Sequence, residues 1–510
     1  MMIRGEIMKK LLVTLITVVF VMFISEITIA SNYKGIVDPY QPITYDTMKE
    51  TVARLKEQFP ELIETEIIGQ SADERDIVLV KLGKGDTLIH INGSFHARER
   101  ITTNIILKNI EDYSNAYEKN TKIQGYDVKN LLDQVTIYFV PMVNPDGVDY
   151  TILGEESIKS PILRVAFEKI VEHPKSEWHT PDLRWKSNIR GVDLNRQWDF
   201  GWHEESKLDI DAPADAYFKG FKPHSEPEVL TMEKLSLYNP FLIYAAYHTQ
   251  GLEIYWYKYQ QGDDLEEVQD ITKKISNLTF FRPVPALNDI PQNFRSYSGY
   301  ADWTAVELKK PSFTMEFAYR KYSEEDFDKI YEPAKALGLL FAEEALNIKE
   351  GYDVEVIING ELIQLFKTYD DGLAFIEKYI TDDMDVQMVK NQEIIYQREG
   401  KPYHDNVEVT IIKDNESIKY SEEVLRYKGA VLLPIDKVFS NFDMKLHHYN
   451  QLNLILAEDN KTLVLMGLND GSIYVNHEKI DATKGVLKYQ DNIYISTTAI
   501  EKIFWCKTNN

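Results

Sequence analysis

The feature that most constrains this chain of 510 residues is a Phe-His-Ala-Arg-Glu run at residues 95–99, which stands between a strand pattern and a helix pattern. Residues 87–92 are mostly apolar or β-branched, which predicts a buried strand, and isoleucines recur at helical spacing from position 101 to 110. We therefore expect His96 and Glu99 to lie at a strand-to-helix junction, where both side chains can converge on one point. A neutral imidazole and a carboxylate suit Zn²⁺, whose nitrogen and oxygen ligands lie at about 2.0–2.2 Å.

A histidine and a glutamate at this spacing also arise by chance, so the motif needs context from the rest of the chain. Residues 141–147 end a predicted strand in an Asn-Pro-Asp-Gly turn. His248 ends a second strand-like run at residues 243–247. Glu316 alternates with Phe313, Met315 and Phe317, so one face of that strand packs while the other presents a carboxylate. A carboxylate held among apolar residues needs a cation or a proton partner nearby.

With these segments in place, residues 45–345 resemble the zinc carboxypeptidase (M14) family of metallopeptidases. The runs at residues 184–191 and 298–303 look most like those of the bacterial γ-D-glutamyl-meso-diaminopimelate peptidases. The resemblance implies that His96, Glu99 and His248 bind one Zn²⁺ per catalytic domain and leave a position open for water. It also implies that Glu316 is the general base that accepts the water's proton and the acid that passes it to the leaving amine.

The same resemblance implies which residues contact the substrate. Arg98 matches a substrate-contacting arginine, and Asn195 with Arg196 matches the pair that grips a terminal carboxylate. A guanidinium fork suits that planar anion. A diaminopimelate carboxylate could be held in the same way, so this pair does not separate the two substrate classes. Ala301 matches a position that tunes side-chain preference, and its small neutral side chain argues against a preference for basic residues.

Two positions depart from the family pattern. Lys186 falls in the place of the arginine that stabilises the oxyanion, with Arg184 or Arg190 as alternatives. A lysine still supplies positive charge there, without the bidentate fork. The family's mobile active-site tyrosine lies several residues before Asp302, where a strict register gives Arg295 in this chain. Tyr300 is our prediction for the substrate contact, and Tyr297 is the alternative.

The pattern along the chain predicts four segments. Residues 1–30 form a signal peptide, with two lysines before an apolar run that is short for a membrane anchor, the alternative. Residues 31–348 form an α/β catalytic domain, whose mixed central sheet is flanked by helices. Residues 349–404 form a small βαββ connector. Residues 405–510 form a β-rich domain with a weak internal repeat, which resembles the copper amine oxidase N-terminal-like stalk module.

The net charge and the cysteine content argue against several classes of function. A net charge of −24 argues against nonspecific binding to nucleic acid or to anionic lipid. The single cysteine, Cys506, excludes an intrachain disulfide and argues against a cysteine metal site or a thiol nucleophile.

We therefore expect a secreted zinc peptidase acting on bacterial cell-wall peptide stems, at or near the γ-D-glutamyl-diaminopimelate bond. It is expected to be extracellular and associated with the wall through its C-terminal domain. One alternative is a carboxypeptidase that trims ordinary peptides. A second is a non-catalytic wall-binding protein built on a peptidase fold.

Overall fold

The structure is a computed structural model. It describes residues 35–172, 185–204, 209–256, 262–284, 299–318, 322–405, 407–413, 416–420, 424–449, 453–459, 462–468, 471–476, 478–480, 485–490, 492–504 and 507–509. The predicted signal peptide, Arg184, Tyr297 and Cys506 lie outside these residues. Among the described helices, none combines the length and the apolar character that a membrane crossing requires.

The catalytic domain is built on an eight-stranded sheet in the order β1-β2-β6-β3-β7-β10-β8-β9. The strands are β1 (Ile63–Gln70), β2 (Asp76–Gly83), β6 (Val135–Val140), β3 (Thr87–Gly93), β7 (Phe241–His248), β10 (Ser312–Glu316), β8 (Glu253–Tyr255) and β9 (Arg282–Pro283). The pairs β6–β3, β3–β7, β7–β10 and β8–β9 are parallel, and the remaining neighbours are antiparallel. The predicted mixed sheet is confirmed.

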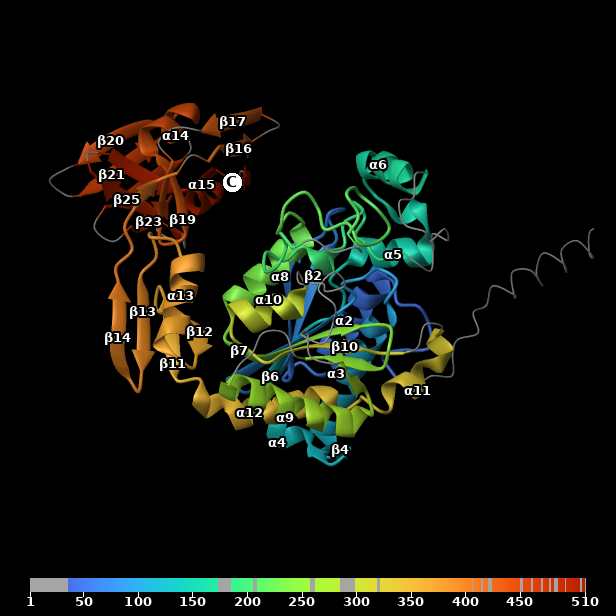
Figure 1. Cartoon of the computed structure of the whole chain (residues 1–510). Coiled ribbons are helices and arrows are strands. Elements are labelled where there is room, and N and C mark those ends of the chain that lie inside the picture. Colours follow the sequence, from blue (N-terminus) through green and yellow to red (C-terminus); the bar gives the residue numbers. More distant parts are fainter. Residues whose placement is uncertain are drawn as a thin grey trace, which may run out of the picture.

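Helices cover both faces of this sheet, and each face has its own apolar core (Figure 1). One core is formed with α2 (Tyr45–Gln58), α3 (Ile101–Lys119), α9 (Gly262–Thr279) and α12 (Leu337–Ile348). The other is formed with α8 (Pro227–Leu237) and α10 (Tyr300–Glu307). The side chains of Phe313, Met315 and Phe317 lie in the first core, so Glu316 faces the second side of the sheet, as its alternation predicted.

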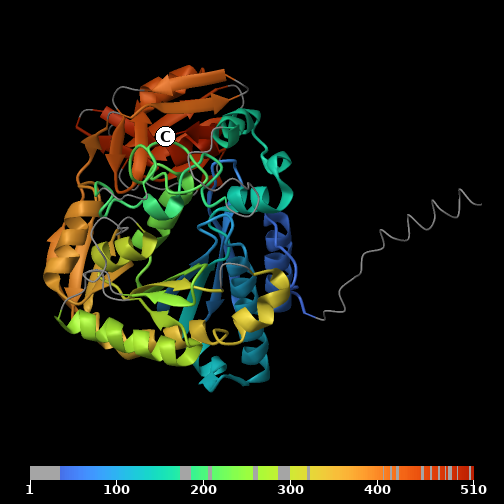
Figure 2. The same cartoon turned by 45° about the vertical axis from the view of Figure 1, so that its right-hand side comes forward.

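The connector has one strand more than predicted. Its order is β11 (Val354–Ile358), β12 (Glu361–Phe366), α13 (Tyr369–Tyr379), β13 (Val386–Lys390) and β14 (Glu393–Arg398), which is ββαββ rather than βαββ. Its apolar residues share a core with α8 and α10. The Gln364 amide also donates to the carbonyls of Ser236 and Asn239, at 2.7 and 2.9 Å. The connector is thus packed onto the catalytic domain (Figure 2).

The C-terminal region is β-rich, as predicted, and its described residues form three antiparallel sheets. Its two short helices, α14 (Ile435–Asn441) and α15 (Thr497–Phe504), follow β19 (Ala430–Pro434) and β26 (Asn492–Ser496). These two strands pair with each other, so the weak repeat corresponds to two strand–helix units side by side. The other strands are β15 (Tyr403–His404), β16 (Val409–Lys413), β17 (Glu416–Tyr420), β18 (Leu425–Tyr427), β20 (Lys445–Tyr449), β21 (Leu454–Glu458), β22 (Leu463–Gly467), β23 (Ile473–Val475), β24 (Glu478–Ile480), β25 (Val486–Tyr489) and β27 (Lys507–Asn509).

Candidate metal centre and active site

The three predicted metal ligands converge at the carboxyl ends of two neighbouring parallel strands. His96 and Glu99 lie between β3 and α3, and His248 is the last residue of β7. Glu99 Oε1 lies 2.9 Å from His96 Nδ1, and Glu99 Oε2 lies 2.9 Å from His248 Nδ1. The two Nδ1 atoms are 3.1 Å apart, and all three side chains are buried. Two imidazole nitrogens and a carboxylate that face one point form a donor set that fits zinc.

A buried aspartate behind the triad fixes the orientation of His96. Asp193 Oδ1 lies 3.2 Å from His96 Nε2 and can accept its proton, which leaves the Nδ1 lone pair facing the triad. Burial alone would raise the pKa of Asp193, but the charge of Lys186 and the contacts with His96 and Arg196 hold that pKa well below its usual range. Asp193 lies two residues before the predicted Asn195, and no sequence signal indicated its contact with the ligand.

Glu316 stands beside the triad, where a general base is needed. It is the residue of β10 directly paired with His248 in the parallel register of β10 and β7. Its Oε2 atom is buried and has no hydrogen-bond partner among the described residues. Burial, followed by the nearby charge of Glu99, raises the pKa of Glu316 well above its usual range. A cation bound at the triad would oppose this effect. Glu316 therefore has a free oxygen with which to accept or donate a proton.

Lys186 and Arg98 bring positive charge to the same place. Lys186 Nζ lies 3.3 Å from Asp193 Oδ2, and its charge lowers the pKa of Glu316, as does that of Arg98. The Nε of Arg98 is buried without a partner among the described residues. Backbone hydrogen bonds join the two loops, from the Ala97 N–H to the Lys186 carbonyl (3.2 Å) and from the Arg98 N–H to the Trp185 carbonyl (3.0 Å).

Of the two alternatives for the oxyanion role, only Arg190 lies within the described residues, and it points elsewhere. Its side chain is 44% exposed and lies 3.7 Å from Glu226 Oε2. Arg184 is not described. The structure therefore places Lys186, rather than Arg190, next to the candidate centre.

The predicted carboxylate-gripping pair lies next to Asp193. Arg196 Nε is 3.5 Å from Asp193 Oδ2, and its Nη1 is 2.9 Å from Asp209 Oδ1. The side-chain oxygen of Asn195 accepts from the backbone N–H of Tyr300, at 2.9 Å. Asn195 thus holds the start of α10, and Arg196 is held by two carboxylates.

The structure places Tyr300, predicted to contact substrate, inside the core. Tyr300 is fully buried, and its hydroxyl lies 2.8 Å from that of Ser236. Its ring packs against Phe95 and Trp198, with centroid separations of 5.3 and 4.9 Å. A tyrosine in the first turn of a helix packed on the sheet is a core residue here, which the motif register could not distinguish from a cleft residue.

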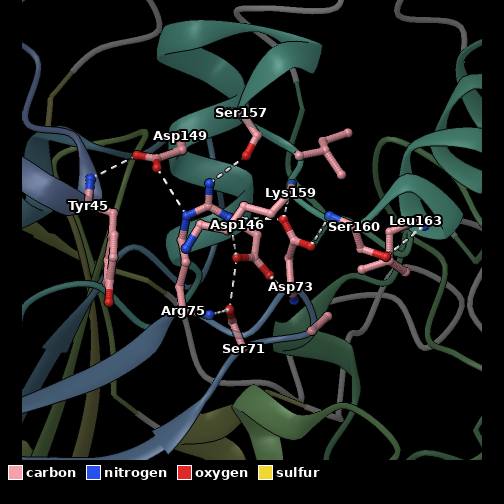
Figure 3. Close-up of polar contacts among 12 residues, drawn as sticks. Tyr45, Ser71, Asp73, Arg75, Asp146, Asp149, Ser157, Lys159, Ser160 and Leu163 are labelled. Atoms are coloured by element: carbon pink, nitrogen blue, oxygen red, sulfur yellow. Dashed lines mark hydrogen bonds and ion pairs between the residues drawn. The ribbon is translucent and has the colours of Figure 1, made fainter.

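The turn at residues 141–147 is hydrogen-bonded to the loop that carries His96 and Glu99. Asn144 caps α5 (Pro145–Leu153), and its amide donates to the carbonyls of Phe95 (3.2 Å) and Ser187 (3.1 Å). Two residues on, Asp146 accepts from Arg75 Nη1 at 2.9 Å (Figure 3). The motif loop is therefore tied to α5 by a buried side chain.

Arg75 is the centre of a buried polar network beneath this turn (Figure 3). Besides Asp146, its guanidinium contacts Asp73 and Asp149, both at 3.1 Å, and donates to the Ser157 carbonyl at 2.6 Å. The network joins the turn between β1 and β2 to α5. No sequence pattern predicted this network, because its members are polar residues in three separate segments.

Comparison with known proteins is consistent with this geometry. A model of the zinc carboxypeptidase family (Peptidase_M14) matches residues 48–359. A protein of Lysinibacillus sphaericus named gamma-D-glutamyl-L-diamino acid endopeptidase 1 is 32% identical over 314 residues, covering 60% of this chain and 73% of that protein. The uncharacterized protein YqgT of Bacillus subtilis is 33% identical over 275 residues (53% and 68%). Carboxypeptidase B of Astacus astacus is 27% identical over 240 residues (46% and 69%).

Proposed function

The chain belongs to the zinc carboxypeptidase family of metallopeptidases, and from this premise we propose that it hydrolyses an amide bond of bacterial cell-wall peptide stems, of the γ-D-glutamyl-diamino acid type. The observation that carries hydrolysis is the convergence of His96, Glu99 and His248 beside Glu316, whose Oε2 is free to exchange a proton. The observation that supports the substrate is the 32% identity with a gamma-D-glutamyl-L-diamino acid endopeptidase.

Each residue of the site has its own role in the proposed reaction. When bound by the triad, zinc lowers the pKa of a water molecule and polarises the scissile carbonyl. Glu316 accepts a proton from the attacking water and delivers it to the leaving amine as the carbon–nitrogen bond breaks. Lys186 and Arg98 supply positive charge where the carbonyl oxygen becomes negative. Asp193 keeps His96 in the orientation that faces the triad.

The charge around the site supports an anionic substrate. The whole chain carries a net charge of −24, yet Lys186, Arg98 and Arg196 gather near the triad. Stem peptides carry several carboxylates, including the free α-carboxylate of a γ-linked glutamate. Fixed cations in a partly buried site favour such a ligand more than they would in open water.

A carboxypeptidase acting on ordinary peptides is the second candidate, supported by the 27% identity with a carboxypeptidase B. Its chemistry at the triad is the same. The non-catalytic wall-binding alternative is not supported, because all three ligands and Glu316 are present and brought together.

The test uses zinc-loaded protein on two substrates, followed by mass spectrometry. One is L-Ala-γ-D-Glu-diaminopimelate, and the other is a set of ordinary peptides with free C-termini. We expect diaminopimelate to be released, and the release to be lost in a Glu316→Ala variant. Trimming of ordinary peptides alone would replace the proposal with the carboxypeptidase alternative.

Export and wall association belong to the same proposal. The pattern at residues 1–30 supports cleavage and secretion, and the β-rich C-terminal region is a suitable spacer or wall-attachment module. Expression of the full chain in a Gram-positive host, with N-terminal sequencing of the protein found in the medium and in the wall fraction, tests both points. Retention of an intact N-terminus in the cytoplasm would contradict them.

A further inference from the structure

Four polar side chains lie in one row across four adjacent strands of the catalytic sheet. In the parallel register of β7 and β10, His248 is paired with Glu316. Glu316 is paired in turn with Glu253 of β8, and Glu253 with Arg282 of β9. Directly paired residues place their side chains on the same face of a sheet. The row therefore runs from a metal ligand, through the general base, to a carboxylate and then a guanidinium at the sheet edge.

The alternation of neighbouring residues supports this orientation. Ile254, which follows Glu253, and Phe281, which precedes Arg282, are both buried in the core on the other face, together with Met315. The side chain of Glu253 also packs closely against Gly251. A Cβ added at Gly251 would lie 3.1 Å from Glu253 Cγ and 3.3 Å from its Oε2. The glycine at position 251 leaves the room that this side chain occupies.

Glu253 and Arg282 form an accessible ion pair. Arg282 Nη2 contacts Glu253 Oε1, and the two side chains are 64% and 20% exposed, respectively. Burial and then the charge of Glu99 raise the pKa of Glu316 most, Lys186 lowers it, and the charge of Glu253 raises it again. The Glu253 carboxylate therefore lies within electrostatic reach of the general base. The pair thus offers one negative and one positive group, side by side, next to the reacting centre.

We propose that the Glu253–Arg282 pair selects substrates whose residue on the leaving side carries both an ammonium and a carboxylate at the far end of its side chain. The distal ammonium pairs with Glu253, and the distal carboxylate pairs with Arg282. This inference rests on the proposed function and names the residues that would recognise its diamino acid. No part of the pair is required for the hydrolytic chemistry itself.

The dimensions of a diamino acid fit the row. In diaminopimelate the two amino-acid centres are separated by four carbon–carbon bonds, about 5 Å when extended. Neighbouring strands are about 4.8 Å apart. If the centre that bears the scissile amide lies between His248 and Glu316, the second centre lies one strand spacing further, between Glu316 and Glu253. The guanidinium of Arg282, on the next strand, contacts the Glu253 carboxylate and so stands beside this point.

The experiment changes only the residue on the leaving side of the scissile amide, in four otherwise identical peptides. Diaminopimelate carries both distal charges, lysine the amine alone, α-aminopimelate the carboxylate alone, and norleucine neither. The ratios of kcat/KM among these peptides are measured for the zinc-loaded full chain and for Glu253→Gln and Arg282→Gln. Lys273→Gln is the matched control, since Lys273 forms an exposed ion pair with Asp270 elsewhere on α9.

Each distal charge is expected to contribute about tenfold to kcat/KM, the low end for hydrogen bonds to charged groups, because the pair is partly exposed. The unaltered chain and Lys273→Gln then favour diaminopimelate over lysine, and lysine over norleucine. Arg282→Gln loses the preference for diaminopimelate over lysine, because the distal carboxylate has no partner. Glu253→Gln loses the preference for lysine over norleucine, because the distal ammonium has none. A change in the Glu316 pKa alters the rates of all four peptides alike and leaves these ratios unchanged.

Ratios that are the same in the unaltered chain and in both variants would overturn the inference. Failure of the proposed function gives a different result. If only ordinary peptide bonds are cleaved, the same four residues are placed after such a bond and the ratios are measured there. The role of the pair is therefore tested whichever bond the enzyme cuts.

Discussion

The two ends of the catalytic row differ in how firmly their side chains are held. At the metal end, Asp193 is fully buried and contacts His96, Lys186 and the backbone N–H groups of Asn195 and Tyr217, at 3.2–3.3 Å. At the β8–β9 edge, the Arg282 side chain is 64% exposed and pairs with Glu253. Bond cleavage requires groups fixed to within a fraction of an ångström, whereas selection among substrates does not. This difference supports our proposal that rate is set at the metal end and substrate preference at the β8–β9 edge.

The largest effect is expected from Glu316→Gln. Glutamine keeps the shape of the side chain but cannot accept the water's proton, so kcat should fall by about 10²–10⁴-fold. Zinc content, measured by elemental analysis, should stay the same because Glu316 is not part of the His96, Glu99 and His248 triad. Activity within tenfold of the unaltered chain would mean that another residue is the base.

Arg75→Leu should cause the largest loss of stability. Its guanidinium neutralises part of a buried cluster of three carboxylates, and their side chains are at most 6% exposed. Removing it leaves buried charge unpaired, at a cost of about 3–5 kcal/mol in the free energy of unfolding measured with urea. Lys49→Leu, which breaks an accessible ion pair with Asp76, is the control and should cost less than about 1 kcal/mol. Equal losses would show that the Arg75 network is not a stabilising anchor.

Glu228 should make the fold less stable as pH rises. Burial, together with the nearby charges of Asp146 and Glu226, raises the pKa of Glu228 from 4.5 to about 8. Because the folded-state pKa is the higher one, the folded chain binds more protons between these values. The contribution of Glu228 to stability is then greatest below about pH 4.5 and is lost as the pH approaches 8.

Glu228→Gln should flatten this part of the pH profile, which urea unfolding at several pH values between 4.5 and 8 measures. At pH 8 the variant should be more stable than the unaltered chain, by roughly 2–4 kcal/mol. An unchanged slope would show that Glu228 is ionised in the folded protein near neutral pH.

The smallest effect on stability is expected at the sheet edge. Glu253→Gln and Arg282→Gln remove an ion pair whose arginine is 64% exposed, and such pairs are worth about 0–1 kcal/mol. Thermal unfolding should therefore change little in either variant, although substrate preference changes. A loss above about 2 kcal/mol would make the pair part of the fold rather than a selector, and the contrast between the two ends of the row would disappear.

Long, regular segments were predictable from the sequence, and short or irregular ones were not. The strand at residues 87–92, the helix after position 101 and the strand that ends at His248 were found because their apolar periodicity is clear. The strand β12 was missed. The pairing of β11 with β12 shifts register between Val356 and Ile357, and such a shift breaks the period-two pattern of a strand.

In the candidate site too, residues on strands with a clear pattern were predictable and residues on very short strands were not. His96 and Glu99 follow β3, and His248 and Glu316 are the last residues of β7 and β10, so all four could be located from the clear apolar patterns of these strands. Glu253 and Arg282 lie on strands of only three and two residues, which carry no readable pattern. Tyr300 was assigned from motif register alone, and register does not show which side of a helix packs against the core.

The most direct test of this account is a calorimetric titration of the metal-free protein with zinc at neutral pH. We predict one zinc per chain, with an affinity that falls by more than about 100-fold in His248→Ala, beyond the cost of losing a residue that only supports a ligand. Binding of equal strength in His248→Ala, or no binding by the unaltered chain, would contradict the assignment of His96, Glu99 and His248 as the metal centre.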